Sequence, residues 1–133
     1  LSAYKMFLDN KILGIGIRNY RNYCNEDRYK THENSCTTHP HNTYVQLLAE
    51  TGLIGFTFSA ILFFYFVFKI LSHLRGALFE KKYQFNDFQI CLLSAIFITI
   101  WPLAPSGNFF NNWISIVYYF PVGFFLWSIQ NKS

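Results

Sequence analysis

The feature that most constrains this chain is a stretch of 44 residues, from Phe88 to Asn131, without Asp, Glu, Lys, Arg or His. A second stretch of 18 residues, from Thr51 to Phe68, also lacks these residue types. A helix needs roughly 20 apolar residues to cross a bilayer, so the longer stretch is sufficient for two crossings. Only 14% of the chain is charged, against about a quarter in a soluble domain. We therefore expect an all-α membrane protein.

The two stretches predict about three transmembrane helices, at 51–71, 88–105 and 113–130. A polar break separates the last two, formed by Ser106, Gly107, Asn108, Asn111 and Asn112. One apolar stretch could be the buried core helix of a soluble protein, but three within 133 residues argue against that class. The region 47–130 is therefore expected to lie in the membrane.

Lys and Arg near the span ends predict the orientation, because cytoplasmic loops are enriched in them. Four surround the connection between the first two spans: Lys69, Arg75, Lys81 and Lys82. The 20 residues before Thr51 contain none. We therefore expect the connection at 72–87 and the tail at 131–133 to be cytoplasmic, and the chain before residue 50 and the turn near 106–112 to face outward. The net charge of +4 is modest and does not indicate nucleic-acid binding.

A helix and a loop are expected before the first span. Apolar side chains recur at helical spacing within residues 1–13 and predict an amphipathic or membrane-proximal helix: Leu1, Tyr4, Phe7, Leu8 and Ile12. Residues 14–46 begin with the turn Gly14-Ile15-Gly16 and continue as an irregular polar segment, which predicts an extracytoplasmic loop. Because the chain starts at Leu1 without Met or a signal sequence, we expect it to be the C-terminal piece of a longer polytopic protein.

His41 and Asn42 lie just outside the first predicted span. Pro40 favours a helix start near His41 or Asn42, and Asn42 is a good N-cap candidate. Histidine is the natural proton acceptor near neutral pH. The pair could be an interfacial histidine beside a capping asparagine. Alternatively, His41 is a general base that deprotonates a hydroxyl, while Asn42 orients the substrate or the imidazole.

Arginines follow the glycine turn in the predicted loop. Arg18 comes directly after the turn, and Arg21, Arg28 and Lys30 follow. Guanidinium groups suit phosphate and pyrophosphate because they can donate two parallel hydrogen bonds. These residues could therefore bind a phosphorylated substrate, with Arg18 favoured by its constrained position, or they could form a basic surface near anionic lipid.

The cysteines and histidines of the loop allow two interpretations. Cys24 and Cys36 face an oxidising compartment in the predicted orientation, and a disulfide between them would close a 13-residue loop. A metal site would combine them with His32, His39 and His41, but these spacings fit no standard zinc pattern. We favour the disulfide and expect no metal and no cofactor.

Further polar and small residues flank the spans. Gly52, Gly55 and Ser59 form a small-residue stripe that would let another helix pack closely. Glu50 is expected to be a structural partner for an arginine, since it would lie opposite His41 on a continuous helix. Asn108, Asn111 and Asn112, beside Trp101 and Trp113, could line a polar sugar-binding cleft or form a simple turn flanked by interfacial tryptophans.

Two of these motifs together resemble the O-antigen ligase and polymerase superfamily. In that family a His followed by Asn, Ser or Gln is separated by nine residues from a glycine, with Gly, Thr or Tyr three positions farther on; here these are His41-Asn42 and Gly52-Leu53-Ile54-Gly55. The segment Asn10-Lys11-Ile12-Leu13-Gly14-Ile15-Gly16 is similar to the family's short Pro-Leu-Leu-Gly-x-Gly element, with Lys11 where a proline is usual. The resemblance covers about residues 5–60, and the later spans match only in layout.

The resemblance implies a fragment of a larger, GT-C-like membrane glycosyltransferase of the bacterial inner membrane. The donor would be a glycan on undecaprenyl pyrophosphate, the acceptor a sugar hydroxyl such as that of lipid A–core, and the reaction metal-independent. His41, in a loop facing the periplasm, would be the base. Repeat-unit polymerisation and glycan transfer to protein are alternatives, and a non-catalytic polysaccharide export or flippase component is an alternative of another class.

Overall fold

The computed structural model describes residues 1–31, 33 and 36–131. Over these residues the chain is helical, without a β-strand. The elements are α1 (Ser2–Asp9), α2 (Tyr20–Tyr23), α3 (Thr43–Arg75), the π-helical turn η1 (Gly76–Glu80), α4 (Asp87–Thr99) and α5 (Asn112–Gln130). The predicted all-α fold class is confirmed.

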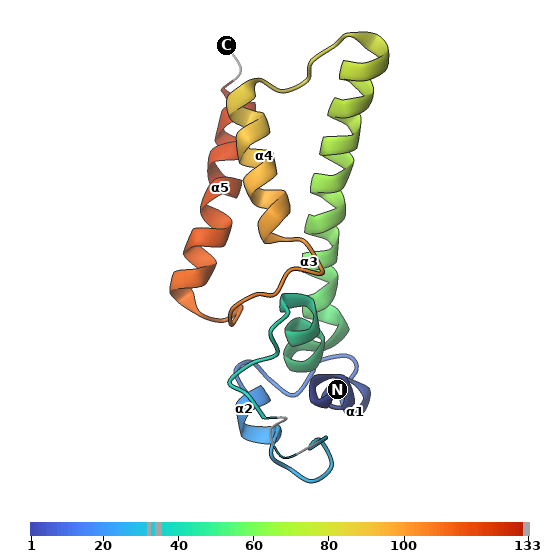
Figure 1. Ribbon diagram of the computed structural model, residues 1–133, viewed down its shortest axis with the longest axis vertical. Helices are drawn as coiled ribbons and strands as arrows, with labels where there is room; N and C mark the ends of the chain where they lie inside the picture. Colours follow the sequence, from blue (N-terminus) through green and yellow to red (C-terminus); the bar gives the residue numbers. More distant parts are fainter. Residues whose placement is uncertain (32, 34–35, 132–133) are drawn as a thin grey trace.

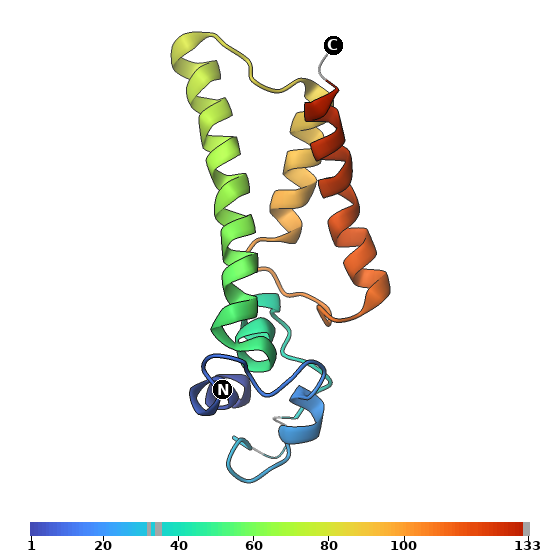
Figure 2. The ribbon, with the colours of Figure 1, turned by 180° about the vertical axis from the view of Figure 1, so that it is seen from behind.

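Helix α3 runs along the length of the molecule, with α4 and α5 beside it (Figure 1, Figure 2). α1, α2 and the loop before α3 lie at one end, together with the loop that joins α4 to α5. The connection from α3 to α4 and the C-terminal end of α5 lie at the other. The segments that the sequence assigns to opposite sides of a membrane are thus at opposite ends of the helices.

Among the described residues, two helical segments are long and apolar enough to cross a bilayer, Thr43–Glu80 and Asn112–Gln130. Helix α4 is shorter: its 13 residues span about 20 Å, against about 30 Å for the hydrocarbon core. Within the predicted span 88–105, the helix thus ends at Thr99. Pro102 explains the early stop, because the residue before a proline avoids the helical region.

Helix α3 begins at Thr43, eight positions before the predicted start of the span, and it is not continuous. Gly52 lies inside it with φ 63° and ψ −158°. This conformation is accessible to glycine and disfavoured for residues with a side chain. The segment from Thr43 to Thr51 is therefore a separate short helix, set off from the membrane-spanning part that follows.

The loop at residues 10–16 fills this break in α3. The carbonyl groups of Ala49 and Glu50, at the end of the short helix, accept hydrogen bonds from the N–H groups of Ile15 and Gly16 at 2.9 and 3.0 Å. A helix end leaves such carbonyls without intrahelical partners, so the loop supplies what the break removes.

The same loop also serves the helix that restarts after Gly52. The N–H groups of Leu53 and Ile54 donate to the carbonyl groups of Lys11 and Ile12 at 2.8 and 3.4 Å. The approach is so close that a Cβ atom on Gly52 would overlap the Ile12 carbonyl group, and one on Gly14 would overlap the Glu50 main chain. We call this contact between residues 10–16 and 49–54 the Gly52 junction.

The predicted amphipathic helix forms, but it ends at Asp9 instead of residue 13. Its buried residues are Ser2, Ala3 and Met6, on the side packed against α3, whereas Leu1, Tyr4 and Leu8 are exposed. Small side chains let α1 lie close to α3, and residues 10–13 are drawn into the Gly52 junction instead of continuing the helix. The larger apolar side chains are left on the outer surface.

Two hydrophobic cores hold the ends of the molecule. The first joins α1, the segment between α1 and α3, and α3 itself, and contains Ala3, Met6, Tyr20, Cys24, Tyr29 and Ala49. The second lies among the long helices and contains Phe66, Phe85, Leu93, Ile96 and Phe125. In Thr43–Glu80 and in Asn112–Gln130, only 6% of the most apolar 18-residue stretch is buried. Their remaining apolar surface is available to lipid or to other helices.

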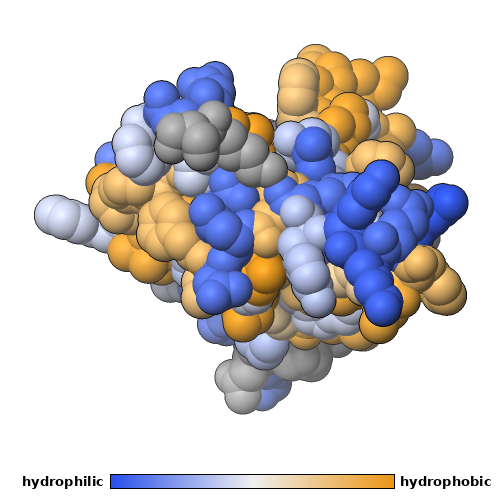
Figure 3. Space-filling view, turned by 90° about the horizontal axis from the view of Figure 1, so that it is seen from above, coloured by the Kyte–Doolittle hydropathy of each residue, from blue (hydrophilic) through white to orange (hydrophobic). Residues whose placement is uncertain are grey.

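The end of the molecule that carries the α3–α4 connection presents basic and apolar side chains together. Viewed from this end, hydrophilic side chains form separate groups with hydrophobic ones between and around them (Figure 3). Leu78, Phe79 and Tyr83 are exposed here. The connection contains Lys81 and Lys82, and Arg75 ends α3. This distribution matches a helix bundle that leaves a bilayer at this end, with basic residues on the predicted cytoplasmic side.

Exchange of Gly52 for Ala should unfold the Gly52 junction. The left-handed backbone alone costs roughly 1–3 kcal/mol for a residue with a side chain, and the new methyl group would also meet the Ile12 carbonyl group. We expect a clearly lower Tm of the detergent-solubilised protein. Gly123→Ala is the matched control, because a Cβ atom there meets nothing within 4 Å. Equal Tm values for the two variants would contradict the role of the junction.

Candidate functional site

Asn42 caps the start of α3 and fixes the residue before it. Its Oδ1 accepts hydrogen bonds from the N–H groups of Tyr44 and Val45 at 3.0 and 3.1 Å, which confirms the predicted N-cap. Its Nδ2 donates to the Pro102 carbonyl group at 2.6 Å. The Asn42 amide thus joins α3 to the α4–α5 loop, and it acts on His41 by holding the adjoining backbone.

Three more hydrogen bonds connect the α4–α5 loop to the residues around His41. The Ser106 N–H donates to the His41 carbonyl group at 3.1 Å, and the Thr43 hydroxyl donates to Ser106 Oγ at 2.8 Å. The Tyr44 hydroxyl donates to the Ile100 carbonyl group at 2.7 Å. The backbone of His41 is therefore fixed, while its imidazole is exposed.

A second imidazole lies beside that of His41. The rings of His39 and His41 are 4.7 Å apart between centroids, edge to face, and His39 Nδ1 is 2.9 Å from the Thr38 hydroxyl. Burial lowers the pKa of His39, and the neighbouring His41 lowers it further. His39 is therefore held in its neutral form over a wider pH range than a free histidine, beside the exposed His41.

A buried polar network links three segments behind this site. Glu50 is 1% exposed and Gln46 0%. The Glu50 carboxylate accepts hydrogen bonds from the Tyr20 N–H and from Gln46 Nε2, each at 2.9 Å. Gln46 Nε2 also donates to Asn108 Oδ1 at 2.7 Å, and Gln46 Oε1 accepts the Phe109 N–H at 2.9 Å. These two side chains tie α2 and the α4–α5 loop to α3.

A polar cleft of about 350 Å³ opens between the α4–α5 loop and the segment that carries Arg18 and Arg21, which we call the arginine loop. It is lined by Arg18, Arg21, Thr38, Asn108, Phe110, Asn111, Asn112 and Trp113. The structure thus brings together the two arginines and the three asparagines that the sequence proposed separately. Thr38 connects the cleft to the histidines, because its hydroxyl contacts His39, which packs against His41. We refer to this site as the polar cleft.

Arg18 is held at the cleft by its backbone and by its side chain. It has a left-handed φ of 61°, directly after the glycine turn. Its Nε and Nη2 donate to the Phe110 carbonyl group at 3.1 and 2.5 Å. A guanidinium has five N–H donors, so Nη1 and one Nη2 hydrogen of Arg18 have no acceptor within the described part of the chain. Arg21 is exposed at the same cleft.

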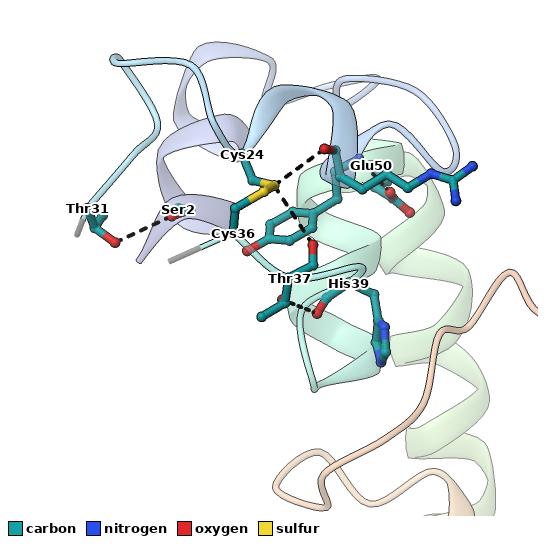
Figure 4. The surroundings of a disulfide bond; sticks show 9 residues. Ser2, Cys24, Thr31, Cys36, Thr37, His39 and Glu50 are labelled. Atoms are coloured by element: carbon teal, nitrogen blue, oxygen red, sulfur yellow. Dashed lines mark hydrogen bonds between the residues drawn. A yellow bond between two sulfur atoms is a disulfide. The ribbon is translucent and has the colours of Figure 1, made fainter. Parts of the chain in front are cut away.

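Cys24 and Cys36 form a disulfide with a Cα–Cα distance of 5.1 Å. Figure 4 shows this bond, with Thr37 and His39 following toward the start of α3 and Glu50 on α3 itself. The bond uses both thiolates that the metal interpretation would need. Among the described residues no group of three His, Cys, Asp or Glu side chains could hold a metal ion; His32 lies outside them.

The small-residue stripe has a different role at its first position. Gly52 meets the loop at residues 10–16 instead of another helix, and Gly55 lies against the Thr51 side chain of its own helix. Ser59 lines a small apolar recess with Tyr44 and Leu62. The close approach that was predicted at Gly52 is therefore present, but its partner is a loop backbone.

Two predictions about partners are corrected. Glu50 pairs with the Tyr20 N–H and Gln46, not with an arginine, and His41 precedes α3, so the helical angle between them does not apply. Trp101 packs against Phe97, with ring centroids 5.1 Å apart, and does not line the polar cleft, whereas Trp113 does.

Sequence reasoning missed Gln46, Thr38 and the pairing of His39 with His41. Gln46 could have been found, because it is four residues before Glu50 in an apolar helix, and residues at this spacing share a face. Two polar residues on one face of such a helix indicate a buried network. Thr38 lies in an irregular loop, where spacing predicts no neighbour.

Comparison with known proteins gives one family match. Residues 2–60 match the family model described as O-antigen ligase. This segment contains α1, the Gly52 junction, both arginines of the polar cleft and His41. No curated protein and no solved structure matches the chain.

Loss of the Glu50 carboxylate should destabilise the buried polar network that supports the polar cleft. Glu50→Ala leaves the buried Tyr20 N–H without its acceptor, which costs about 1–3 kcal/mol, and Gln46 loses one of its bonds. We expect a lower Tm for this variant. Glu80→Ala, at an exposed position at the other end of the molecule, should leave the Tm unchanged. A wild-type Tm for Glu50→Ala would argue against the network.

Proposed function

Since residues 2–60 resemble O-antigen ligases, we propose that this chain forms the catalytic end of a membrane glycosyltransferase. The reaction moves a glycan from undecaprenyl pyrophosphate to an acceptor hydroxyl, as in O-antigen ligation to lipid A–core. The observation that carries this proposal is the position of His41. Its imidazole is exposed, and its backbone is fixed by the α4–α5 loop. Through His39 and Thr38 it is linked to a cleft that contains two arginines.

In the proposed reaction His41 acts as the general base. Its imidazole takes the proton of the acceptor hydroxyl while the hydroxyl oxygen attacks the anomeric carbon of the donor sugar. The bond from that carbon to the pyrophosphate oxygen breaks, and undecaprenyl pyrophosphate leaves as an anion. In this proposal the guanidinium groups of Arg18 and Arg21 stabilise the charge that develops on the leaving group. No metal or cofactor takes part in these steps.

Repeat-unit polymerisation and transfer to protein hydroxyls would use the same base and the same leaving group. Only the acceptor differs between the three reactions. Lipid A–core is our first choice of acceptor, because the matching family model is that of the O-antigen ligases.

The proposed location is the bacterial inner membrane, with the polar cleft facing the periplasm. The cleft and the basic α3–α4 connection lie at opposite ends of the long helices. Basic residues mark the cytoplasmic side, so the cleft faces the compartment where a disulfide such as Cys24–Cys36 is stable. The chemistry would thus take place at the outer rim of the bilayer, next to the pyrophosphate of the lipid donor.

Exchange of His41 for Gln tests the base. The substitution leaves the backbone bond from Ser106 in place, and glutamine cannot accept the proton. We expect the rate of transfer to fall by about 10²–10⁴-fold, with unchanged membrane insertion and Tm. Transfer is measured with the full-length protein, a lipid-linked donor and the acceptor.

His39→Gln is the matched control at the neighbouring imidazole. Its transfer rate should fall far less than that of His41→Gln. Full activity of His41→Gln together with an inactive His39→Gln would contradict the assignment and move the base to His39.

A further inference from the structure

The polar cleft has a wall that lies outside the segment matched by the family. Residues 2–60 supply Arg18, Arg21 and Thr38. The facing wall comes from the α4–α5 loop and the first turn of α5, and it consists of Asn108, Phe110, Asn111, Asn112 and Trp113. The family match therefore says nothing about what this wall binds, and its chemistry has to be judged from the side chains.

The amides of this wall are partly engaged and partly open. Asn108 Oδ1 accepts hydrogen bonds from Gln46 Nε2 and the Phe110 N–H, and Asn111 Oδ1 caps the Trp113 N–H at 3.1 Å. Their Nδ2 groups, and the whole side chain of Asn112, have no hydrogen-bond partner among the described residues. The oxygens that are used fix the loop, while the open groups include both donors and an acceptor.

Trp113 presents a large aromatic surface next to these amides. Its side chain is 81% exposed, although its backbone is fixed in the capped first turn of α5. An exposed indole at the end of a span is common as an interfacial anchor. Here, however, the indole also lines a cleft that contains amides and guanidinium groups, and an anchor in the headgroup region has no need of such a cleft.

Amide, indole and guanidinium groups together match the parts of a glycosyl phosphate. A sugar ring has an apolar C–H face that can pack on an indole, and its hydroxyl groups both donate and accept, as amides do. A phosphate suits the guanidinium fork. The volume of about 350 Å³ is near the lower limit of about 300 Å³ for ligand pockets, which suits one sugar residue with its phosphate.

We infer that the polar cleft holds the first sugar of the lipid-linked donor. The ring packs on Trp113, its hydroxyl groups bind Asn111 Nδ2 and the Asn112 amide, and its phosphate lies at Arg18 and Arg21. The α4–α5 loop then determines which sugar is accepted, because it supplies the groups that contact the ring. This inference rests on the proposed function for the identity of the donor, but the binding itself does not depend on catalysis.

The test measures binding and transfer separately in the full-length protein. Calorimetric titration uses three probes: inorganic phosphate, a panel of hexose 1-phosphates and N-acetylhexosamine 1-phosphates, and the corresponding free sugars. We expect at least one sugar 1-phosphate to bind more tightly than phosphate or the free sugar. Trp113→Ala should remove this preference and raise the donor KM about tenfold with little change in kcat, and Trp113→Phe should restore part of it.

The control is Trp127→Ala, at the other end of α5. Trp127 is also exposed, at 59%, and does not line the polar cleft, so its removal should leave binding and KM unchanged. Asn112→Ala should weaken sugar phosphate binding and leave phosphate binding intact. An unchanged donor KM in Trp113→Ala, or equal losses in Trp113→Ala and Trp127→Ala, would overturn the sugar site and leave Trp113 as a membrane anchor.

The two proposals fail in different ways. If His41→Gln retains full transfer while Trp113→Ala loses sugar phosphate binding, the base assignment falls and the sugar site stands. If His41→Gln is inactive and no sugar 1-phosphate binds better than phosphate, the sugar site falls and the proposed function stands.

Discussion

The exchange of backbone hydrogen bonds at the Gly52 junction is the contact on which the rest of this structure depends. A helix that breaks at the edge of a bilayer exposes carbonyl and N–H groups, and leaving them unpaired in an apolar environment would cost several kcal/mol each. The loop at residues 10–16 satisfies both sides of the break. Because the loop is bound at the junction, the position of Arg18, which follows the loop, is fixed. The C-terminal end of the short helix that begins after His41 is fixed by the same contact. The Gly52 junction thus sets the positions of Arg18 and His41 relative to each other, although they are far apart in the sequence.

The α4–α5 loop completes the arrangement from the opposite side. Its carbonyl groups bind the Asn42 amide and the Tyr44 hydroxyl, and its turn is held by the buried Gln46. Buried polar side chains are costly unless they are paired, and a fully paired network specifies one arrangement. The polar residues at the start of α3 lie on more than one face of the helix. They bring the arginine loop, the histidines and the α4–α5 loop together. Without these residues, few hydrogen bonds would hold the arginine loop and the α4–α5 loop close to each other.

Sequence reasoning was most successful where a local rule decides the structure. The long charge-free stretches gave the helices, and Asn42 gave the start of α3, because capping depends on the residue itself. It failed where a distant partner decides. The helix predicted over residues 1–13 ends at Asp9, because the residues after it bind at the Gly52 junction instead. Gly52 was expected to contact another helix, since nothing in a spacing pattern announces a loop backbone. The joining of Arg18 with Asn108 and Trp113 depends on a chain reversal between α4 and α5, so it was visible only in three dimensions.

The disulfide between Cys24 and Cys36 has a consequence for the order in which the protein matures. Thiols remain reduced in the cytosol, so in the orientation proposed above the bond forms after this loop has left the cytosol. The loop includes Tyr29, which is buried in the same core as Met6 of α1. In the proposed periplasmic orientation, the disulfide would fix the arginine loop only after that loop has crossed the membrane. Protein made in a reducing cell-free system would form its membrane helices but lack the Cys24–Cys36 disulfide.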